Sequence, residues 1–213
     1  CDTGKLTPVD EFETNYRQLV SRIQAQDSVQ GVVVLNVPDV TCIAYLSESS
    51  DPDAPAGSVK PFWLYESTDE FVLTPDDIAM IQDRQQEIND IIYELVAANG
   101  WAFVDVSQNF IDVRNYGHYL RDGDGAYTSR VVGTEYLGGL FSLDGVHASS
   151  TGYAVAANYI VDSVNSTYST RIPYVDEYEV SEEDTLLQDP YDPRGMVDGW
   201  IGSGTSSLKR SEV

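Results

Sequence analysis

Residues 31–39 read GVVVLNVPD, and this stretch decides the fold that we expect. Four apolar residues follow one another from Val32 to Leu35, and Asn36 and Pro38 end the run. A short, continuous apolar run of this kind is typical of a strand that is buried on both faces. Such strands occur in parallel sheets that helices cover, so the stretch predicts an α/β fold with a parallel sheet.

Amphipathic segments lie on both sides of this stretch in the sequence. The first begins with Thr7 as the predicted N-cap and Pro8 at the first helical position, and it continues to about residue 23. The second repeats these signals from Thr74 and ends at Gly100. Immediately after it, WAFVDV predicts a second buried strand. The helices would therefore alternate with strands along the chain.

A further helix is predicted from Thr151, as its cap, to about Tyr168. The order helix, strand, helix, strand, helix is that of an α/β sandwich with right-handed crossovers. Two strands are too few for such a sheet, because the edges of both strands need neighbours. We therefore expect that part of the sheet comes from outside this sequence.

The segment at 47–72 is predicted to be a surface excursion, since it is rich in Ser, Pro and Asp. Its aromatic residues Phe62, Trp63 and Tyr65 would either line an acyl-binding cleft or pack within the loop. After residue 180 the chain is acidic and then rich in Gly, Pro and Ser. We expect residues 181–213 to form an extended tail.

RDGDGAYTSR, at 121–130, contains two Asp-Gly steps, which favour a hairpin turn. Asp122 and Asp124 could instead be calcium ligands. The loop that starts at Asp122 lacks Gly at its sixth place and Glu at its twelfth, so the turn is favoured.

The composition excludes several classes of protein. The chain has 35 Asp and Glu against 12 Lys and Arg, a net charge of -23, which argues against binding to nucleic acids or anionic membranes. No apolar run is long enough to span a bilayer. The acidity indicates either a well-solvated surface or adaptation to high salt. The two cysteines, Cys1 and Cys42, would suit one disulfide in a secreted protein or two free thiols in a cytosolic one, and we favour the disulfide.

Asp144 and His147 are the candidate catalytic residues. They lie three apart in FSLDGVH, and Gly145 between them allows a tight bend. A serine hydrolase needs an imidazole that takes the nucleophile's proton and a carboxylate that orients the imidazole. From the spacing alone, which is a weak pattern, the favoured interpretation is that Asp144 is a turn residue and His147 a helix-entry residue. His118, between two tyrosines, is predicted to be a packing or surface residue.

The surroundings of this pair resemble a known family. LDGVH followed by GYAVAANYI is similar to the last conserved block of the SGNH, or GDSL-type, hydrolases. Upstream, VVVLNVPDVTCIAYL is similar to a strand and its following loop in bacterial GDSL-like lipases and esterases. LTPDDIAMIQDRQQEINDII with GWAFVDV, and later RIPYVDEY, continue the resemblance. It covers roughly residues 3–180 in order, although Ala148 stands where the family usually has Pro.

The resemblance implies a three-layer, flavodoxin-like sandwich with a parallel sheet, of which this chain would hold the C-terminal strands and helices at 1–180. It also implies that Asp144 and His147 belong to a Ser-His-Asp triad of a carboxylic-ester hydrolase. The family's Gly-Asp-Ser and Gly-x-Asn-Asp blocks are absent from this sequence. The nucleophile would then come from an N-terminal segment or a companion chain. The protein would be extracellular or at the cell surface, for example associated with an outer membrane.

No metal or organic cofactor is implied by this resemblance, and the substrate would be a small-molecule or lipid ester. A second interpretation remains open: the chain could be a non-catalytic structural or binding subunit of an extracellular assembly.

Overall fold

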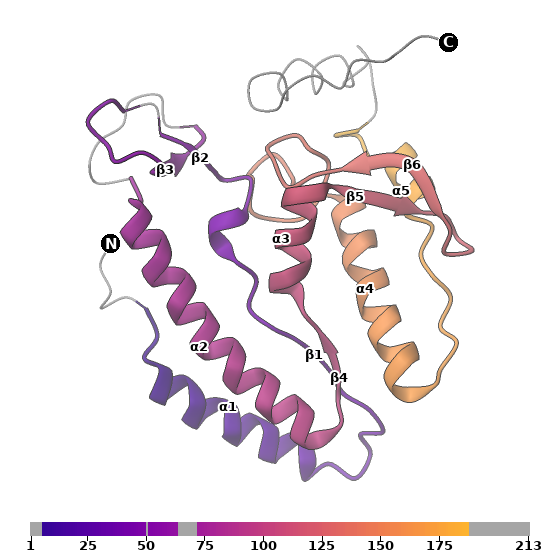
Figure 1. Cartoon of the computed structure of the whole chain (residues 1–213). Coiled ribbons are helices and arrows are strands. Elements are labelled where there is room, and N and C mark those ends of the chain that lie inside the picture. The colour runs from indigo at the N-terminus through magenta and orange to yellow at the C-terminus, as the bar shows by residue number, and fades with distance from the viewer. Residues whose placement is uncertain (1–5, 50, 64–71, 188–213) are drawn as a thin grey trace.

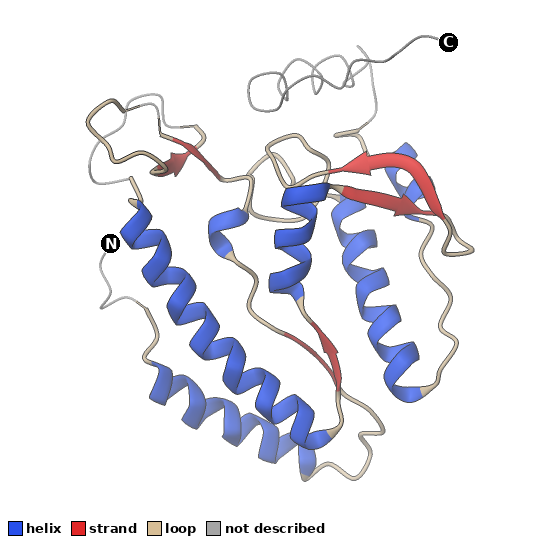
Figure 2. Cartoon of the chain, viewed as in Figure 1, coloured by secondary structure: helices blue, strands red, loops and turns tan. Residues whose placement is uncertain are grey.

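The computed structural model describes residues 6–49, 51–63 and 72–187. It is a mixed α/β structure with long helices and short strands (Figures 1 and 2). The two strands expected from the sequence are β1 (Val33–Leu35) and β4 (Ala102–Val104), and they pair in parallel. Helix α2 (Pro75–Asn99) and helix α4 (Ser150–Tyr168) both contact β4 and lie on opposite sides of the strand pair in Figure 1.

The strands of this pair differ in burial. Ala102 and Val104 of β4 are buried, as expected. In β1, however, Leu35 remains 43% exposed, so the prediction of burial on both faces is wrong for this strand. The helices account for the difference, because α2 and α4 both contact β4, whereas α4 contacts β1 less extensively. Each strand has the other as its single strand neighbour among the described residues. The other edge of β1 is therefore unpaired there.

The first helix, α1 (Val9–Gln24), begins one residue later than predicted. Pro8 has an extended ψ of 139° and is itself the N-cap, and its carbonyl accepts the first helical bond from Phe12 N at 2.9 Å. The prediction that Thr7 caps this helix is therefore wrong. Helix α1 packs against α2 at the outer face of the molecule (Figure 1).

Helix α2 has both predicted ends. Thr74 and Asp77 form a reciprocal capping box in which Asp77 N donates to Thr74 Oγ1 and Thr74 N donates to Asp77 Oδ2. Pro75 is the first helical residue, and Gly100 ends the helix with a left-handed φ of 63°.

The remaining elements lie around the carboxyl ends of β1 and β4 (Figure 1). A 3-10 helix, η2 (Val40–Cys42), follows β1 and leads to the antiparallel pair β2 (Leu46–Glu48) and β3 (Val59–Pro61). Helix α3 (Val106–Tyr116) follows β4. The excursion predicted at 47–72 thus contains most of one short hairpin, and Tyr65 lies outside the described residues.

The predicted hairpin at the Asp-Gly steps is confirmed. Strands β5 (His118–Arg121) and β6 (Tyr127–Val132) pair in antiparallel fashion across this turn. Asp122 Oδ1 accepts hydrogen bonds from the backbone N–H groups of Asp124 and Ala126, so its side chain stabilises the turn. No group of three potential metal ligands occurs in the described part of the chain.

Helix α4 is capped by Ser149, whose hydroxyl accepts from Gly152 N at 3.0 Å. The prediction of Thr151 as the cap is wrong, because Thr151 lies within the first turn, where its hydroxyl donates to Asp184 Oδ2 at 2.9 Å. Helix α5 (Glu177–Glu183) packs against α4. Residues 181–187, which the sequence assigns to the tail, therefore belong to the packed structure.

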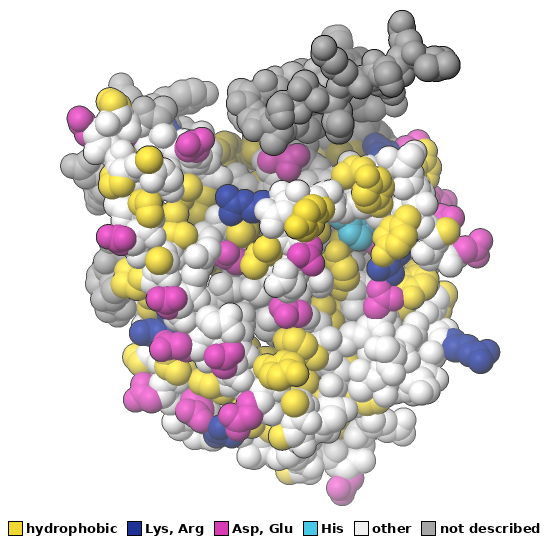
Figure 3. Space-filling model, in the orientation of Figure 1, with side chains coloured by type: hydrophobic (Ala, Val, Ile, Leu, Met, Phe, Trp, Pro, Cys, Tyr) yellow, Lys and Arg dark blue, Asp and Glu magenta, His cyan; other side chains and the backbone are white. Residues whose placement is uncertain are grey.

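One cluster of the core lies between the β5–β6 hairpin and α4. Leu120, Val132 and Val155 are buried together, and Leu140, Tyr159 and Leu187 pack around them. On the surface, acidic side chains are spread widely over the face seen in Figure 3, and basic ones are few. No helix among the described residues has the length and hydropathy that crossing a bilayer requires.

Candidate active site

The structure brings Asp144 and His147 into direct contact. Asp144 Oδ2 lies 2.6 Å from His147 Nδ1. The other carboxylate oxygen, Oδ1, accepts three hydrogen bonds, from Ser142 Oγ at 2.7 Å and from the backbone N–H groups of Val146 and His147 at 2.9 Å each. One oxygen therefore shapes the turn while the other orients the imidazole.

Gly145 is the residue that makes this turn possible. Its φ of 71° is left-handed, which favours glycine. Its carbonyl accepts from Tyr45 N at 2.8 Å, and a Cβ at this position would lie 2.6 Å from the same nitrogen. The turn is thus in close contact with the backbone of residues 44–45, which connect η2 to β2.

The remaining backbone of the loop is also bonded. Ser142 N donates to the carbonyl of His147 at 2.8 Å, and Phe141 and Ala148 form an antiparallel bridge. The chain then enters α4 directly through its Ser149 cap. Both catalytic candidates are therefore held by a closed local loop at the start of a rigid helix.

The hydrogen bonds also determine the charge of Asp144. The bond with His147, followed by those from Val146 N, Ser142 Oγ and His147 N, lowers the pKa of the Asp144 carboxyl well below its usual range. Because an ionised carboxylate can only accept, the Nδ1 of His147 carries a proton. The lone pair of a neutral imidazole is then on Nε2.

Nε2 of His147 is available for chemistry. The His147 side chain is 73% exposed, and no hydrogen bond to Nε2 occurs within the described residues. In particular, no Ser, Thr or Cys side chain of the described segments is bonded to it. The arrangement can accept a proton from a group that approaches from outside.

The site lies where α/β folds usually place their ligands. The loop contacts residues 44–45, which follow the carboxyl end of β1, and α4 begins at the same end of the molecule (Figure 1). A cavity of about 220 Å³, partly lined by Ala44, lies beside this contact. Ala44 C would be 2.9 Å from a Cβ on Gly145, so the cavity and the catalytic loop share a wall.

His118, in contrast, has a structural environment. It is 7% exposed in β5, with Nε2 at 2.9 Å from Glu177 Oε2 and Nδ1 at 3.1 Å from the Tyr159 hydroxyl. Glu177 is completely buried and also accepts from Arg121 N and Asn158 Nδ2. The prediction of a packing role for His118 is confirmed: it joins β5 to α4 and α5.

The cysteines and the aromatic residues of the 47–72 segment were also singled out in the sequence. Cys42 is a buried free thiol, and Cys1 lies outside the described residues. Phe62 stacks on Tyr136, with 4.1 Å between ring centroids, and contacts Tyr45 edge-on. Phe62 therefore packs within the loops, whereas Trp63 is half exposed.

Two features of this region were not predicted from the sequence. The Ser142 hydroxyl supports Asp144, and its signal was the Ser-x-Asp spacing, which is typical of a side chain that bonds two residues along. The second feature is the cavity wall, where Arg114 and Thr134 meet η2. These residues are far apart in the sequence, and no local pattern predicts that they meet.

Comparison of the chain with protein-family models, with curated proteins and with solved structures found no match. The assignment of function therefore depends on the residues and their geometry.

Proposed function

We propose that this chain supplies the acid–base pair of an SGNH-type serine hydrolase that acts on carboxylic esters. The observation that carries this proposal is the 2.6 Å contact between Asp144 Oδ2 and His147 Nδ1, with Nε2 of His147 directed to no partner in the described structure. This is the arrangement of an imidazole that is oriented by a carboxylate and ready to act as a general base.

The proposed reaction has two stages. His147 Nε2 takes the proton of a serine hydroxyl while that oxygen attacks the ester carbonyl, and it returns the proton to the leaving alcohol. A water molecule then hydrolyses the acyl-enzyme with the same residue as base. Asp144 keeps the imidazole in the required tautomer and stabilises the imidazolium that forms in each stage. No metal or organic cofactor takes part.

The serine and the oxyanion-hole groups would come from an N-terminal segment or a companion chain. The unpaired edge of β1 supports this, because a further parallel strand could pair there and complete the three-layer sandwich expected of the family. The substrate would be a small-molecule or lipid ester, and the location extracellular or at the cell surface.

The first test is an intact-mass spectrum of the purified protein after treatment with a fluorophosphonate, before and after reduction. We expect a labelled companion polypeptide beside the unlabelled 213-residue chain. A preparation in which nothing is labelled and no ester is hydrolysed would contradict the proposal.

The second test is His147→Ala in the same complete protein. We expect ester hydrolysis to fall by at least about 10³-fold, because removal of a triad residue has effects of this size. Circular dichroism should be unchanged, since the side chain is mostly exposed. Full activity in this variant would remove His147 from the mechanism.

The edge of β1 also favours a second function. An unpaired strand edge can bind another chain by main-chain hydrogen bonds without any catalysis. The chain would then be a structural or binding subunit of an extracellular assembly. A stable complex that contains this chain, hydrolyses no ester and takes up no fluorophosphonate would support this alternative.

A further inference from the structure

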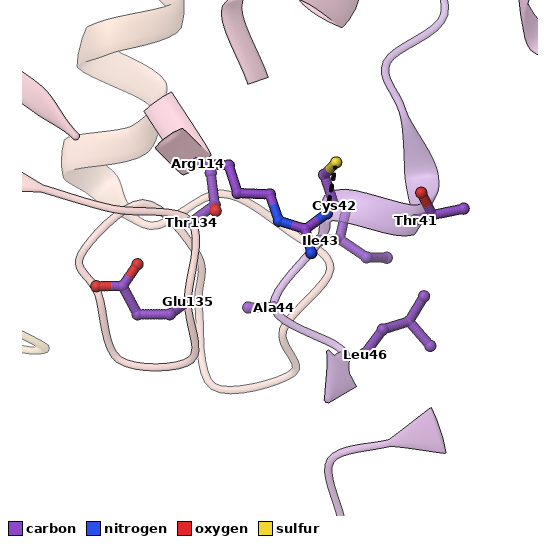
Figure 4. A pocket seen from close by; sticks show the side chains of 8 residues that line it. All are labelled: Thr41, Cys42, Ile43, Ala44, Leu46, Arg114, Thr134 and Glu135. Atoms are coloured by element: carbon purple, nitrogen blue, oxygen red, sulfur yellow. Dashed lines mark hydrogen bonds between the residues drawn. The ribbon is translucent and has the colours of Figure 1, made fainter. Parts of the chain in front are cut away.

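A cavity of about 220 Å³ lies between η2, α3 and the loop that follows β6 (Figure 4). Its polar wall includes Cys42, Arg114 and Thr134, and its apolar wall includes Ile43, Ala44 and Leu46. This combination of one cation, one hydroxyl and short aliphatic side chains is suited to a small amphipathic ligand.

Arg114 is the cation of this cavity, and it forms no direct ion pair with a carboxylate of the described residues. Arg17, Arg84, Arg121 and Arg130 each pair with an acidic side chain. The Arg114 guanidinium has one hydrogen bond, from Nη1 to Cys42 Sγ at 3.1 Å, and a thiol is a weak acceptor. Most of its N–H donors therefore remain available to a ligand, in a protein of net charge -23.

Glu135 is the nearest acidic side chain in the wall, but it does not pair with Arg114. Its carboxylate points away from the guanidinium in Figure 4. It lies over the backbone of Gly133 and Gly138, where a Cβ would be 2.2 Å and 2.9 Å from its carboxylate oxygens. The loop after β6 thus turns its negative charge away from the cavity.

Thr134 supplies a second polar group to the cavity wall. It is 5% exposed and lines the cavity, yet its hydroxyl has no hydrogen-bond partner among the described residues. In contrast, the Thr41 hydroxyl in the same wall donates to Asp39 and accepts from Gln82. Arg121 Nε is the one side-chain atom of the described residues that is fully buried without a partner, so the Thr134 hydroxyl is open to the cavity and can bond to water or to a ligand there.

We propose that this cavity binds the carboxylate of a small aliphatic monocarboxylic acid, which Arg114 and Thr134 hold at its polar wall. A guanidinium matches the planar carboxylate with two N–H groups, and the threonine hydroxyl supplies a third donor. Ile43, Ala44 and Leu46 cover the aliphatic part. A dianion such as phosphate is less suited to the site than a monoanion, because the Asp39 carboxylate, 3.2 Å from the Cys42 thiol, repels two charges more strongly than one.

This binding site does not require the ester hydrolase proposed above. If that activity exists, however, a short carboxylic acid is the class of product that it releases, and the cavity adjoins the catalytic loop through Ala44. Binding can be measured without any catalysis, so failure of one proposal is distinguishable from failure of the other.

The test is a titration of the full-length protein with sodium butyrate, followed by amide chemical shifts in NMR spectra. We expect saturable shifts at Thr134 and Ala44 and none with butyramide, which has the same shape without the charge. Arg114→Gln should weaken binding by at least about tenfold, because it removes the charged, bidentate donor. Thr134→Val should weaken it by about fivefold, as loss of one hydrogen bond predicts.

Arg171→Gln is the matched control. It removes one positive charge from a residue that follows the far end of α4 and lines no described cavity. Binding should be unchanged in this variant. Absence of saturable shifts, equal shifts with butyramide, or full binding by Arg114→Gln would each overturn the proposal.

A second readout uses the thiol. In Cys1→Ser, Cys42 is the only cysteine, and iodoacetate and iodoacetamide are nearly identical in size but differ in charge. Because Arg114 attracts the iodoacetate anion, we expect the ratio of the iodoacetate rate to the iodoacetamide rate to be about tenfold higher in the folded protein than in urea. Arg114→Gln should abolish this preference. A ratio equal to that in urea, or a preference that Arg114→Gln retains, would count against the site.

Discussion

At Asp144, each carboxylate oxygen has a separate task. Oδ1 accepts three bonds that keep the turn closed, and Oδ2 alone faces the imidazole of His147. The carboxyl is held ionised by these donors, because its pKa is lowered mainly by the bond with His147. The orientation of the imidazole therefore does not depend on pH over the range in which esters are normally assayed.

Asp144→Asn tests this arrangement in the complete protein. An amide can donate to Nδ1 and so favours the wrong tautomer, and we expect kcat for p-nitrophenyl acetate to fall by about 10³- to 10⁴-fold. Asp27→Asn is the matched control, because this substitution removes the same charge from an exposed side chain. A loss of less than tenfold in Asp144→Asn would mean that the imidazole needs no carboxylate.

Tyr159 gives a pH-dependent prediction. Burial, followed by the charge of Glu177, raises the pKa of its hydroxyl to about 12. In the unfolded chain this group ionises near its ordinary value of about 10. The neutral hydroxyl is favoured in the fold, so the stability linked to it is present below pH 10 and is lost as the pH rises towards 12.

We therefore expect the free energy of unfolding of the wild-type protein to fall more steeply between pH 9 and about 11.5 than that of Tyr159→Phe. Tyr159→Phe also loses the bond to His118, so it should be the less stable protein at pH 8. Urea denaturation at several pH values measures both effects. Parallel pH profiles would show that Tyr159 ionises normally in the folded state.

At the scale of elements, the helix ends show what sequence can predict. The capping box at Thr74 was correctly predicted, because it depends on four consecutive residues. The same signals were misleading at Thr7, where Pro8 adopts an extended conformation and takes the capping position. At α4, Ser149 caps the helix. The Thr151 hydroxyl instead donates to Asp184, which is distant in the sequence.

Thr74→Ala and Thr7→Ala form a matched pair. Thr74→Ala should lower the free energy of unfolding by about 1 kcal/mol, as loss of an N-cap usually does. Thr7→Ala should have no measurable effect, since no side-chain cap bond exists at α1. Equilibrium urea denaturation of both variants provides the comparison, and equal effects would refute the assignment of the two caps.

The candidate site divides in the same way between predictable and unpredictable parts. Asp144 and His147 were predictable because only two residues lie between them, and a single turn brings them together. The contact of Gly145 with Tyr45, the cavity between η2 and α3, and the meeting of Arg114 with Thr134 depend on long-range packing. The lower burial of β1 also depends on its neighbours, which an apolar run cannot reveal.

At the scale of the whole molecule, charge is the dominant property. A net charge of -23 on 213 residues creates self-repulsion that destabilises the folded state at low ionic strength. Surface ion pairs such as Arg17 with Glu13 and Glu94 offset only a small part of it, because exposed pairs are weak. Added salt should therefore stabilise the fold.

We expect the Tm to rise by about 4 °C or more between 0.02 M and 0.5 M NaCl, which corresponds to roughly 1–2 kcal/mol for a domain of this size. Most of the rise should occur by about 0.15 M, where the Debye length has fallen to about 8 Å. Differential scanning calorimetry at several salt concentrations measures it. A Tm that is constant or falls with salt would show that the acidic groups are too well solvated to repel one another.

The closed turn at residues 142–148 has a consequence for the order of folding. Contacts between residues close in sequence form early, because little chain entropy is lost in bringing them together. The Asp144–His147 bond closes a loop of only a few residues, and the cap of α4 follows it directly. This half of the proposed triad can therefore be complete before the rest of the domain has assembled. Hydrolysis would begin only when the nucleophile arrives, so the last step of assembly would also be the step that starts the activity.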